Sequence, residues 1–153
     1  MAARRNGTAP AAMTLARSIG IEKPAAKGRL LGMEELREAI DAGLPYALLE
    51  RLRGQLGASI EEIAEVLRIS PRTLARRRRE GRLSPEESDR LYRVAHVFAE
   101  AVDLLGDAAE AAAWLRQPNL ALSGTTPLAL LHNTIGVREV EALIGRVKFG
   151  VSL

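Results

Sequence analysis

Three helix-start signals follow one another closely between residues 59 and 87. Ser59 is followed by Glu62 at the spacing of a capping box, in which a hydroxyl and a carboxylate satisfy the free amides of a first helical turn. Ser70 and Ser84 each precede a proline, and proline is well tolerated at the first position of a helix. These starts leave room for two short helices joined by a tight turn, followed by a third helix. The arrangement predicts a helix-turn-helix.

The other segments also carry apolar residues at helical spacing, and none alternates as a half-buried β-strand would. We therefore predict an all-α fold. Besides the three helices that begin after Ser59, Ser70 and Ser84, helices are expected over residues 33–43, 45–57, 107–118, 126–133 and 136–150. The segment NLALSGTTP is expected to form a loop, from which Thr126 and Pro127 begin the next helix.

The predicted helix-turn-helix gives each of its apolar positions a role. Ala64 lies where the two short helices approach most closely, Ile69 fills the turn, and Leu74 anchors the second helix to the core. Arg68 occupies the turn position at which glycine is usual, so it is expected to adopt a positive φ. In this motif the second helix enters the major groove, where side chains on its outer face contact DNA.

The second helix of the motif is rich in arginine. The formal net charge is only +3, but residues 68–93 hold nine arginines and four acidic residues. Arg72, Thr73 and Arg76 are expected to face outward, where the planar fork of an arginine binds guanine or phosphate. With the run that follows, the candidate DNA-binding residues are Arg72, Thr73, Arg76, Arg77 and Arg79.

Arg77 falls on the face of this helix where an apolar residue is usual. Two explanations are open: the helix ends early and Arg77 to Arg79 turn toward phosphates, or their aliphatic stems lie along apolar surface. A plainer alternative for the whole run is a solvated helix end, because the helix dipole favours cations at the C-terminus. The local density of arginine favours DNA contact over that alternative.

The sequence offers little for catalysis or metal binding. It has no cysteine and only two histidines, so a zinc site would have to rely on carboxylates. It contains neither a GxSxG motif nor a glycine-rich phosphate loop. His96 lies among apolar residues and is interpreted as a partly buried structural residue, and His132 as a helix cap. We predict a protein that is not an enzyme, with no catalytic residue, no metal site and no cofactor.

Residues 1–31 are expected to form a flexible basic arm, since residues 1–29 hold six basic residues and one acidic residue. The start, MAARRNGTAPAAMTLARSIG, also has the composition of a transit peptide, which is the less favoured alternative. No apolar run approaches the roughly 20 residues that cross a bilayer, and the start lacks the apolar stretch of a secretory signal. We expect a cytoplasmic protein without a membrane partner.

Three longer motifs carry a family resemblance. RTLARRRREGRLSPEESDRLYRVAHVF begins at Arg72, WLRQPNLALSGTTPLALL at Trp114 and GVREVEALIGRVKFGV at Gly136. In this order they resemble the Xre/MbcA/ParS antitoxin family, from about residue 32 to the end of the chain. The first motif, with SDRL starting at Ser88, is similar to the family's helix-turn-helix and the long helix after it. The second and third are similar to its C-terminal toxin-binding domain.

The resemblance implies a bacterial antitoxin of a type II toxin-antitoxin system, which inhibits a RES-domain toxin that consumes NAD and represses its own operon by binding operator DNA. An Xre-like helix-turn-helix domain for DNA binding and homodimer formation would cover residues 32–105, and a small helical toxin-binding domain residues 106–153. The end of the chain would block the active site of the toxin. The residues implied in toxin binding are Arg146, Lys148, Phe149, Gly150 and Leu153.

Two of the residues in these motifs also have plainer interpretations. Trp114, the only tryptophan, matches an internal motif of the family together with Leu115, Pro118 and Asn119, but its size favours the core. Phe149 either anchors in a pocket of a partner or packs the last helix onto its own domain. Two other functions stay open: a plain helix-turn-helix transcriptional repressor without a toxin partner, and a helical scaffold without DNA contact.

Overall fold

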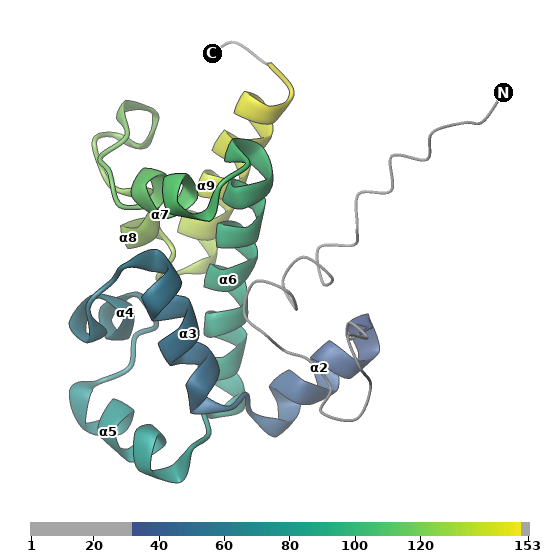
Figure 1. Ribbon diagram of the computed structural model, residues 1–153, viewed down its shortest axis with the longest axis vertical. Helices are drawn as coiled ribbons and strands as arrows, with labels where there is room; N and C mark the ends of the chain where they lie inside the picture. The colour runs from purple at the N-terminus through teal and green to yellow at the C-terminus, as the bar shows by residue number, and fades with distance from the viewer. Residues whose placement is uncertain (1–31, 151–153) are drawn as a thin grey trace, which may run out of the picture.

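The computed structural model describes residues 32–150, and within this range the chain folds into helices joined by turns and loops (Figure 1). The all-α prediction is confirmed. The α-helices are α2 (Met33–Ala42), α3 (Tyr46–Leu56), α4 (Ile60–Val66), α5 (Pro71–Glu80), α6 (Pro85–Leu105), α7 (Ala108–Leu115), α8 (Pro127–Leu130) and α9 (Thr134–Lys148), and a 3-10 helix, η1, spans Leu120–Leu122.

The long helix α6 packs against three other helices, α2, α7 and α9. Its buried face carries Leu91, Val94 and Phe98, whose side chains are almost completely inaccessible to solvent. Helix α2 packs against α6 near one end, and α7 and α9 pack against it farther along (Figure 1). Because apolar residues recur along α6 at helical spacing, this one helix buries the apolar faces of elements from both halves of the chain.

One hydrophobic core joins the helix-turn-helix to the C-terminal helices. Leu52 of α3, Leu91 of α6, Leu115 of α7 and Val140 of α9 belong to the same cluster of buried side chains. In addition, α3 packs against α7, and α4 against α8. Trp114 lies partly buried against this cluster, in agreement with its interpretation as a core residue. The packing is continuous between the two predicted domains, and their boundary stays a prediction.

The serine helix starts are confirmed. The hydroxyls of Ser59, Ser70 and Ser84 accept hydrogen bonds from backbone amides three residues later, at 3.1, 3.2 and 3.1 Å. At Ser84 the Glu87 carboxylate also accepts a hydrogen bond from the serine amide, which completes a capping box. At Ser59 the carboxylate of the predicted partner, Glu62, binds Arg116 of the C-terminal half instead. A tertiary contact has therefore replaced half of the predicted box.

Three local details refine the predicted elements. Arg68 has a φ of 54°, so the expected left-handed turn residue is confirmed. The predicted loop after Pro118 contains η1, because the Asn119 side chain accepts a hydrogen bond from the amide of Ala121 and caps a short turn. Helix α9 begins at Thr134, two residues earlier than predicted, because Asn133 caps it by accepting a hydrogen bond from Gly136 at 2.8 Å.

A set of backbone contacts fixes the loop before α6 against the loop between α2 and α3. The amide of Leu83 donates to the carbonyl of Leu44, and the amide of Leu44 donates to the hydroxyl of Ser88 at 2.7 Å. The Arg82 guanidinium donates to the carbonyl of Gly43. Gly43 has a φ of 88°, and a Cβ there would lie 2.3 Å from the Leu83 carbonyl oxygen, so only glycine fits. These contacts hold the chain that leaves the C-terminal end of α5 in a defined position.

Candidate functional site

Helix α5 presents arginines to solvent while one leucine holds it to the core. Leu74 is 7% exposed and occupies the predicted anchor position. Arg72, Arg76 and Arg79 lie on the exposed side of the helix, roughly opposite Leu74. Within residues 32–150 no ion pair engages Arg72 or Arg79, so both guanidinium groups are available to an external anion.

Thr73 and Arg76 are engaged by local contacts within the α5 segment. The Thr73 hydroxyl accepts a hydrogen bond from the Ser70 hydroxyl at 3.0 Å, which places it at the N-terminal end of the helix. Arg76 Nε lies 3.8 Å from Glu80 Oε1, and the two side chains are 54% and 48% exposed. Such an exposed pair contributes little free energy, because water screens it. Arg76 can therefore leave Glu80 and bind a phosphate at little cost in free energy.

Arg77 differs from its neighbours because it joins α5 to α6. Its Nε donates a hydrogen bond of 2.8 Å to Glu87 Oε2, and its Nη1 donates one of 3.1 Å to Glu80 Oε2. The Arg77 side chain is 19% exposed and the Glu87 side chain 9%. Helix α5 continues to Glu80, so the explanation in which it ends before Arg77 is wrong. The guanidinium group of Arg77 is held by the protein's own carboxylates.

The Glu87 carboxylate is the common acceptor at this junction. Its Oε2 atom accepts two hydrogen bonds, one from Arg77 Nε and one from the backbone amide of Ser84, each at 2.8 Å. Burial by itself raises the pKa of the Glu87 carboxyl, but the hydrogen bonds from Arg77 and Ser84 outweigh it and leave the pKa below its ordinary value. Glu87 is therefore ionised at neutral pH and fixes the angle between α5 and α6.

The end of α9 forms a second exposed feature. Val140, Leu143 and Ile144 bury one face of the helix in the core. Beyond them the apolar side chains are solvent-exposed: Val147 is 56% exposed and Phe149 77%. Phe149 therefore does not pack the last helix onto its own domain, and that alternative is wrong.

Positive charge accompanies the exposed aromatic ring at the end of α9. Arg146 and Lys148 lie in the last helical turn, and Lys148 Nζ stands 6.0 Å from the centre of the Phe149 ring. Gly150 follows with a φ of 65°, which turns the chain away from the helix direction. Leu153, the fifth residue implied in toxin binding, lies outside the described residues. The described part of the segment presents an exposed aromatic ring with one lysine beside it.

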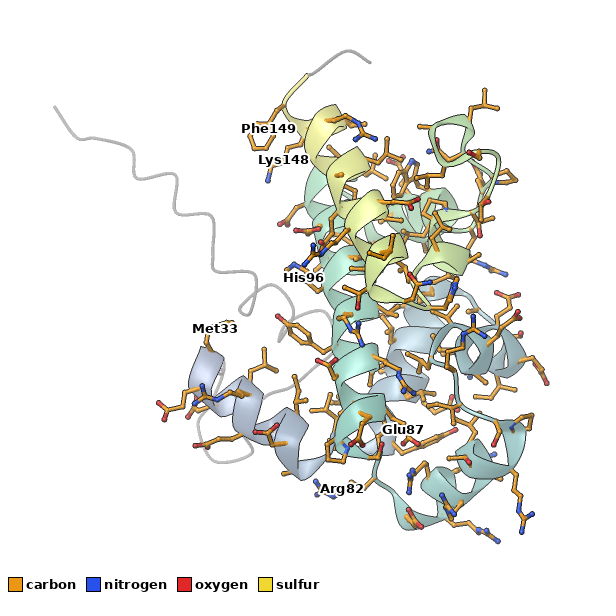
Figure 2. The ribbon with its side chains drawn as sticks, turned by 180° about the vertical axis from the view of Figure 1, so that it is seen from behind. Met33, Arg82, Glu87, His96, Lys148 and Phe149 are labelled. Carbon is orange, nitrogen blue, oxygen red and sulfur yellow. The ribbon has the colours of Figure 1, made fainter. Side chains whose placement is uncertain are left out.

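The two exposed features lie at opposite ends of the molecule. Figure 2 shows Phe149 and Lys148 at one end of the fold, and Arg82 and Glu87, beside α5, at the other. Helix α6 runs between them (Figure 2). Neither feature covers the other, so the two are separately accessible.

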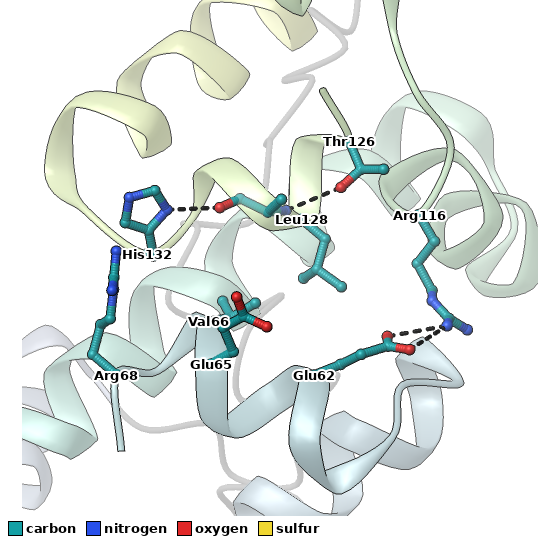
Figure 3. Close-up of a pocket in the computed structure, with 9 residues that line it drawn as sticks. Glu62, Glu65, Val66, Arg68, Arg116, Thr126, Leu128 and His132 are labelled. Carbon is teal, nitrogen blue, oxygen red and sulfur yellow. Dashed lines mark hydrogen bonds and ion pairs between the residues drawn. The ribbon is translucent and has the colours of Figure 1, made fainter. Parts of the chain in front are cut away.

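A cavity of about 420 Å³ lies between α4 and α8, where the helix-turn-helix meets the C-terminal helices (Figure 3). Arg116 Nη2 binds both carboxylate oxygens of Glu62 at 3.0 Å on one side of it. His132, on the other side, is held by Ala129 and Asn133: its Nδ1 lies 2.7 Å from the Ala129 carbonyl oxygen and its Nε2 3.0 Å from Asn133 Nδ2. These contacts agree with the interpretation of His132 as part of a helix end.

Sequence reasoning missed three of the polar contacts that organise these regions. They are the Arg77 contact with Glu87, the Arg116 contact with Glu62, and a cluster of His96 with Glu100 and Glu141. Of these contacts, the sequence indicates only the one between His96 and Glu100, because residues four apart are neighbours on a helix surface. The other contacts join residues of separate elements, and no local pattern indicates them.

The fold and its exposed features define a helix-turn-helix protein with a second helical unit at its C-terminal side. Comparison with known proteins makes the assignment specific. Residues 35–96 match the family model of the antitoxin Xre-like helix-turn-helix domain, and residues 100–150 match that of the antitoxin Xre/MbcA/ParS C-terminal toxin-binding domain. The chain belongs to the Xre/MbcA/ParS family of antitoxins.

Individual relatives support this membership. Antitoxin Xre of Yersinia enterocolitica is 39% identical over 149 residues, which cover 93% of this chain and 94% of the relative. Antitoxin Xre of Photorhabdus laumondii is 30% identical over 118 residues, which cover 76% and 80%. A chain in the crystal structure of the M. tuberculosis MbcT-MbcA toxin-antitoxin complex is 27% identical, with a TM-score of 0.52, and the match covers 71% of this chain and 96% of that one.

The predicted family resemblance is confirmed. The protein is an antitoxin of a toxin-antitoxin system, with a helix-turn-helix and a toxin-binding domain, and a toxin is accordingly its partner. This favours the antitoxin over a plain repressor and over a helical scaffold. No helix within residues 32–150 is both long and apolar enough to span a membrane.

Proposed function

We propose that this antitoxin inhibits a RES-domain toxin that consumes NAD, by placing its C-terminal segment in the toxin's active site. The observation that carries the proposal is the exposed end of α9. Phe149 is 77% exposed, although an aromatic ring gains free energy by leaving water. Aromatic side chains that become buried in a pocket of the partner are typical anchors of protein–protein interfaces.

The proposed toxin contacts are the five residues at the end of the chain: Arg146, Lys148, Phe149, Gly150 and Leu153, the last of which lies outside the described residues. Phe149 supplies the apolar contact, and Arg146 and Lys148 supply positive charge beside it. The buried apolar side chains of α9 end at Ile144, and Arg146 is half-buried after them. Lys148, Phe149 and Gly150 are exposed, so this part of the segment can enter a cleft without disturbing the fold. Inhibition then follows from exclusion of NAD by an occupied cleft, without catalysis and without a cofactor.

The second half of the proposal is repression of the antitoxin's own operon. Arg72, Thr73, Arg76 and Arg79 would contact operator DNA from α5, because they lie on its exposed side or at its N-terminal end. Arg77 is also among the candidates from sequence, but Glu87 and Glu80 hold its guanidinium group. It would therefore support DNA binding indirectly, by holding α5 in position.

We place DNA binding and homodimer formation in residues 32–105, toxin binding in residues 106–153, and the protein in the bacterial cytoplasm. A homodimer would present two recognition helices to two operator half-sites. Their centres would be about one helical turn of DNA, roughly 34 Å, apart or a multiple of that distance.

The test of inhibition is a titration of NAD consumption by the RES-domain toxin encoded beside this gene. The purified full-length antitoxin should stop NAD loss at a fixed ratio of the two proteins. A chain that lacks residues 146–153 should fail to stop it while it still binds operator DNA. NAD loss that continues with the full-length chain would exclude this toxin class, and inhibition by the shortened chain would exclude the role of the segment.

A further inference from the structure

A histidine and two carboxylates meet on the surface where α6 packs against α9. His96 and Glu100 are four residues apart on α6 and therefore share one face of that helix, and Glu141 approaches them from α9. His96 Nε2 lies 3.4 Å from Glu100 Oε1 and 3.9 Å from Glu141 Oε1. One ligand atom from each residue lies within 4.8 Å of the other two. Among the described residues this is the one group with such a spacing of possible metal ligands.

The histidine ring is held in position before any ligand arrives. The Tyr92 ring stacks on it with a centre-to-centre distance of 6.0 Å and an angle of 17° between the planes. The His96 side chain is 20% exposed, and the two carboxylates are 37% and 36% exposed, so solvent reaches all three residues. Nε2 points toward both carboxylates, which is the direction a ligand nitrogen needs.

The charges of the group favour a divalent cation. With a neutral histidine the two carboxylates carry two negative charges, and with a protonated histidine one remains uncompensated within the group. A divalent cation bound to a neutral imidazole and two carboxylates would give the group no net charge.

We propose that His96, Glu100 and Glu141 bind one Zn²⁺ ion, which joins α6 to α9. Zinc accepts imidazole nitrogen and carboxylate oxygen at about 2.0–2.2 Å, and in a tetrahedron such ligand atoms stand about 3.3 Å apart. The observed separations from His96 Nε2 are 3.4 and 3.9 Å, and all three ligand atoms lie within 4.8 Å of one another, so side-chain rotations that draw them closer can reach this geometry. Three protein ligands leave the fourth position to water. The imidazole ligand and the low number of oxygens favour zinc over magnesium or calcium.

The location gives the ion a role beyond the proposed toxin and operator contacts. Glu141 lies on α9 before the turn that carries Arg146 and Lys148. Zinc bound between the two helices would hold α9 on α6 and limit the positions of the exposed C-terminal segment. The other histidine, His132, is engaged by Ala129 and Asn133 and lies at the far side of the helix-turn-helix cavity, so it offers no second site of this kind.

The test uses the full-length protein after removal of metal, titrated with ZnCl₂ in a calorimeter and, separately, with Co²⁺ followed by visible absorption. The proposal requires binding of one Zn²⁺ per chain and the intense visible bands of four-coordinate Co²⁺. Glu100→Gln and Glu141→Gln keep the side-chain shape and remove one ligand charge. Each should weaken Zn²⁺ binding by more than about 100-fold, because loss of an outer-shell partner alone costs roughly 10- to 100-fold.

Two control variants separate this site from adventitious binding. Glu139→Gln removes a charge from an exposed position of α9, and His132→Asn removes the other histidine. Both should bind Zn²⁺ as the unaltered protein does, and circular dichroism should show all four variants folded. Absence of Zn²⁺ binding by the unaltered protein, or equal binding by Glu141→Gln and Glu139→Gln, would overturn the proposal. So would loss of binding in His132→Asn alone.

Discussion

Helix α5 and the end of α9 both present positive charge to solvent, but they are held in opposite ways. Helix α5 is fixed by the Ser70 cap, by Leu74 in the core and by the Arg77 contact with Glu87. The last turn of α9 extends past its final core contact at Ile144 and carries Phe149 in solvent. A surface that reads a rigid DNA groove needs a fixed position, whereas a segment that enters a protein cleft needs freedom to adapt.

The largest expected effect comes from removing the Glu87 carboxylate that holds α5 in position. Glu87→Ala removes the less exposed of the two carboxylates that hold Arg77, together with half of a capping box, and leaves the partly buried Arg77 cation with Glu80 alone. We expect the free energy of unfolding to fall by about 3 kcal/mol, the scale for breaking a buried ion pair. Urea denaturation measures it. Glu86→Ala, at the exposed neighbouring position, is the matched control and should change stability by about 0.5 kcal/mol or less. Equal losses in both variants would contradict the role of Glu87.

The next effect falls on the exposed end of α9. Phe149→Ala should leave the unfolding transition unchanged, because the ring is 77% exposed, and should weaken toxin binding by about 2 kcal/mol, roughly 30-fold. Calorimetric titration with the purified toxin measures the change. Met33→Ala, which shortens an apolar side chain that is 63% exposed on α2 and lies outside the proposed toxin-binding region, should bind the toxin normally. Tight binding by Phe149→Ala would show that the anchor lies elsewhere.

A smaller effect is expected for single contacts of α5 with DNA. Arg72→Ala should weaken operator binding by about 1–2 kcal/mol. If Arg72 contacts a phosphate, the slope of the logarithm of the binding constant against the logarithm of the salt concentration should fall in magnitude by about one. Fluorescence anisotropy at several salt concentrations measures both quantities. Arg51→Ala removes the same charge from an exposed position on α3 and is the control. If the two variants bind alike, α5 is not the recognition helix.

The smallest effect is the pH dependence of the Glu87 contact. The folded-state pKa of Glu87 lies below its ordinary value of 4.5, so the stabilisation is fully present above that value and is lost as pH falls through the lower folded-state pKa. We expect the stability difference between the unaltered protein and Glu87→Gln to be constant above pH 4.5, to shrink as the pH falls below 4.5, and to be lost below the folded-state pKa. Urea midpoints across this range measure it. A difference that is constant with pH would mean that Glu87 does not act through its charge.

Much of the fold could be predicted because its signals are local. The hydroxyl of Ser70 caps α5 from three residues away, and the positive φ of Arg68 follows from the geometry of a helix-turn-helix. The exposed face of α5 also followed from helical spacing. The role of Arg77 did not, because its partner Glu87 belongs to the next helix, and the same spacing is compatible with a solvated arginine.

The sequence by itself determined where helices begin and which of their faces are apolar. It also determined that the second helix of the helix-turn-helix is rich in arginine. Each of these depends on residues within about one helical turn of each other, where geometry is fixed by the backbone. Only the tertiary structure decided that Glu62 binds Arg116, that Glu141 meets His96, and that Phe149 stays in solvent. These outcomes depend on how whole helices pack, because packing brings together charges that are distant in the chain and leaves some apolar positions uncovered.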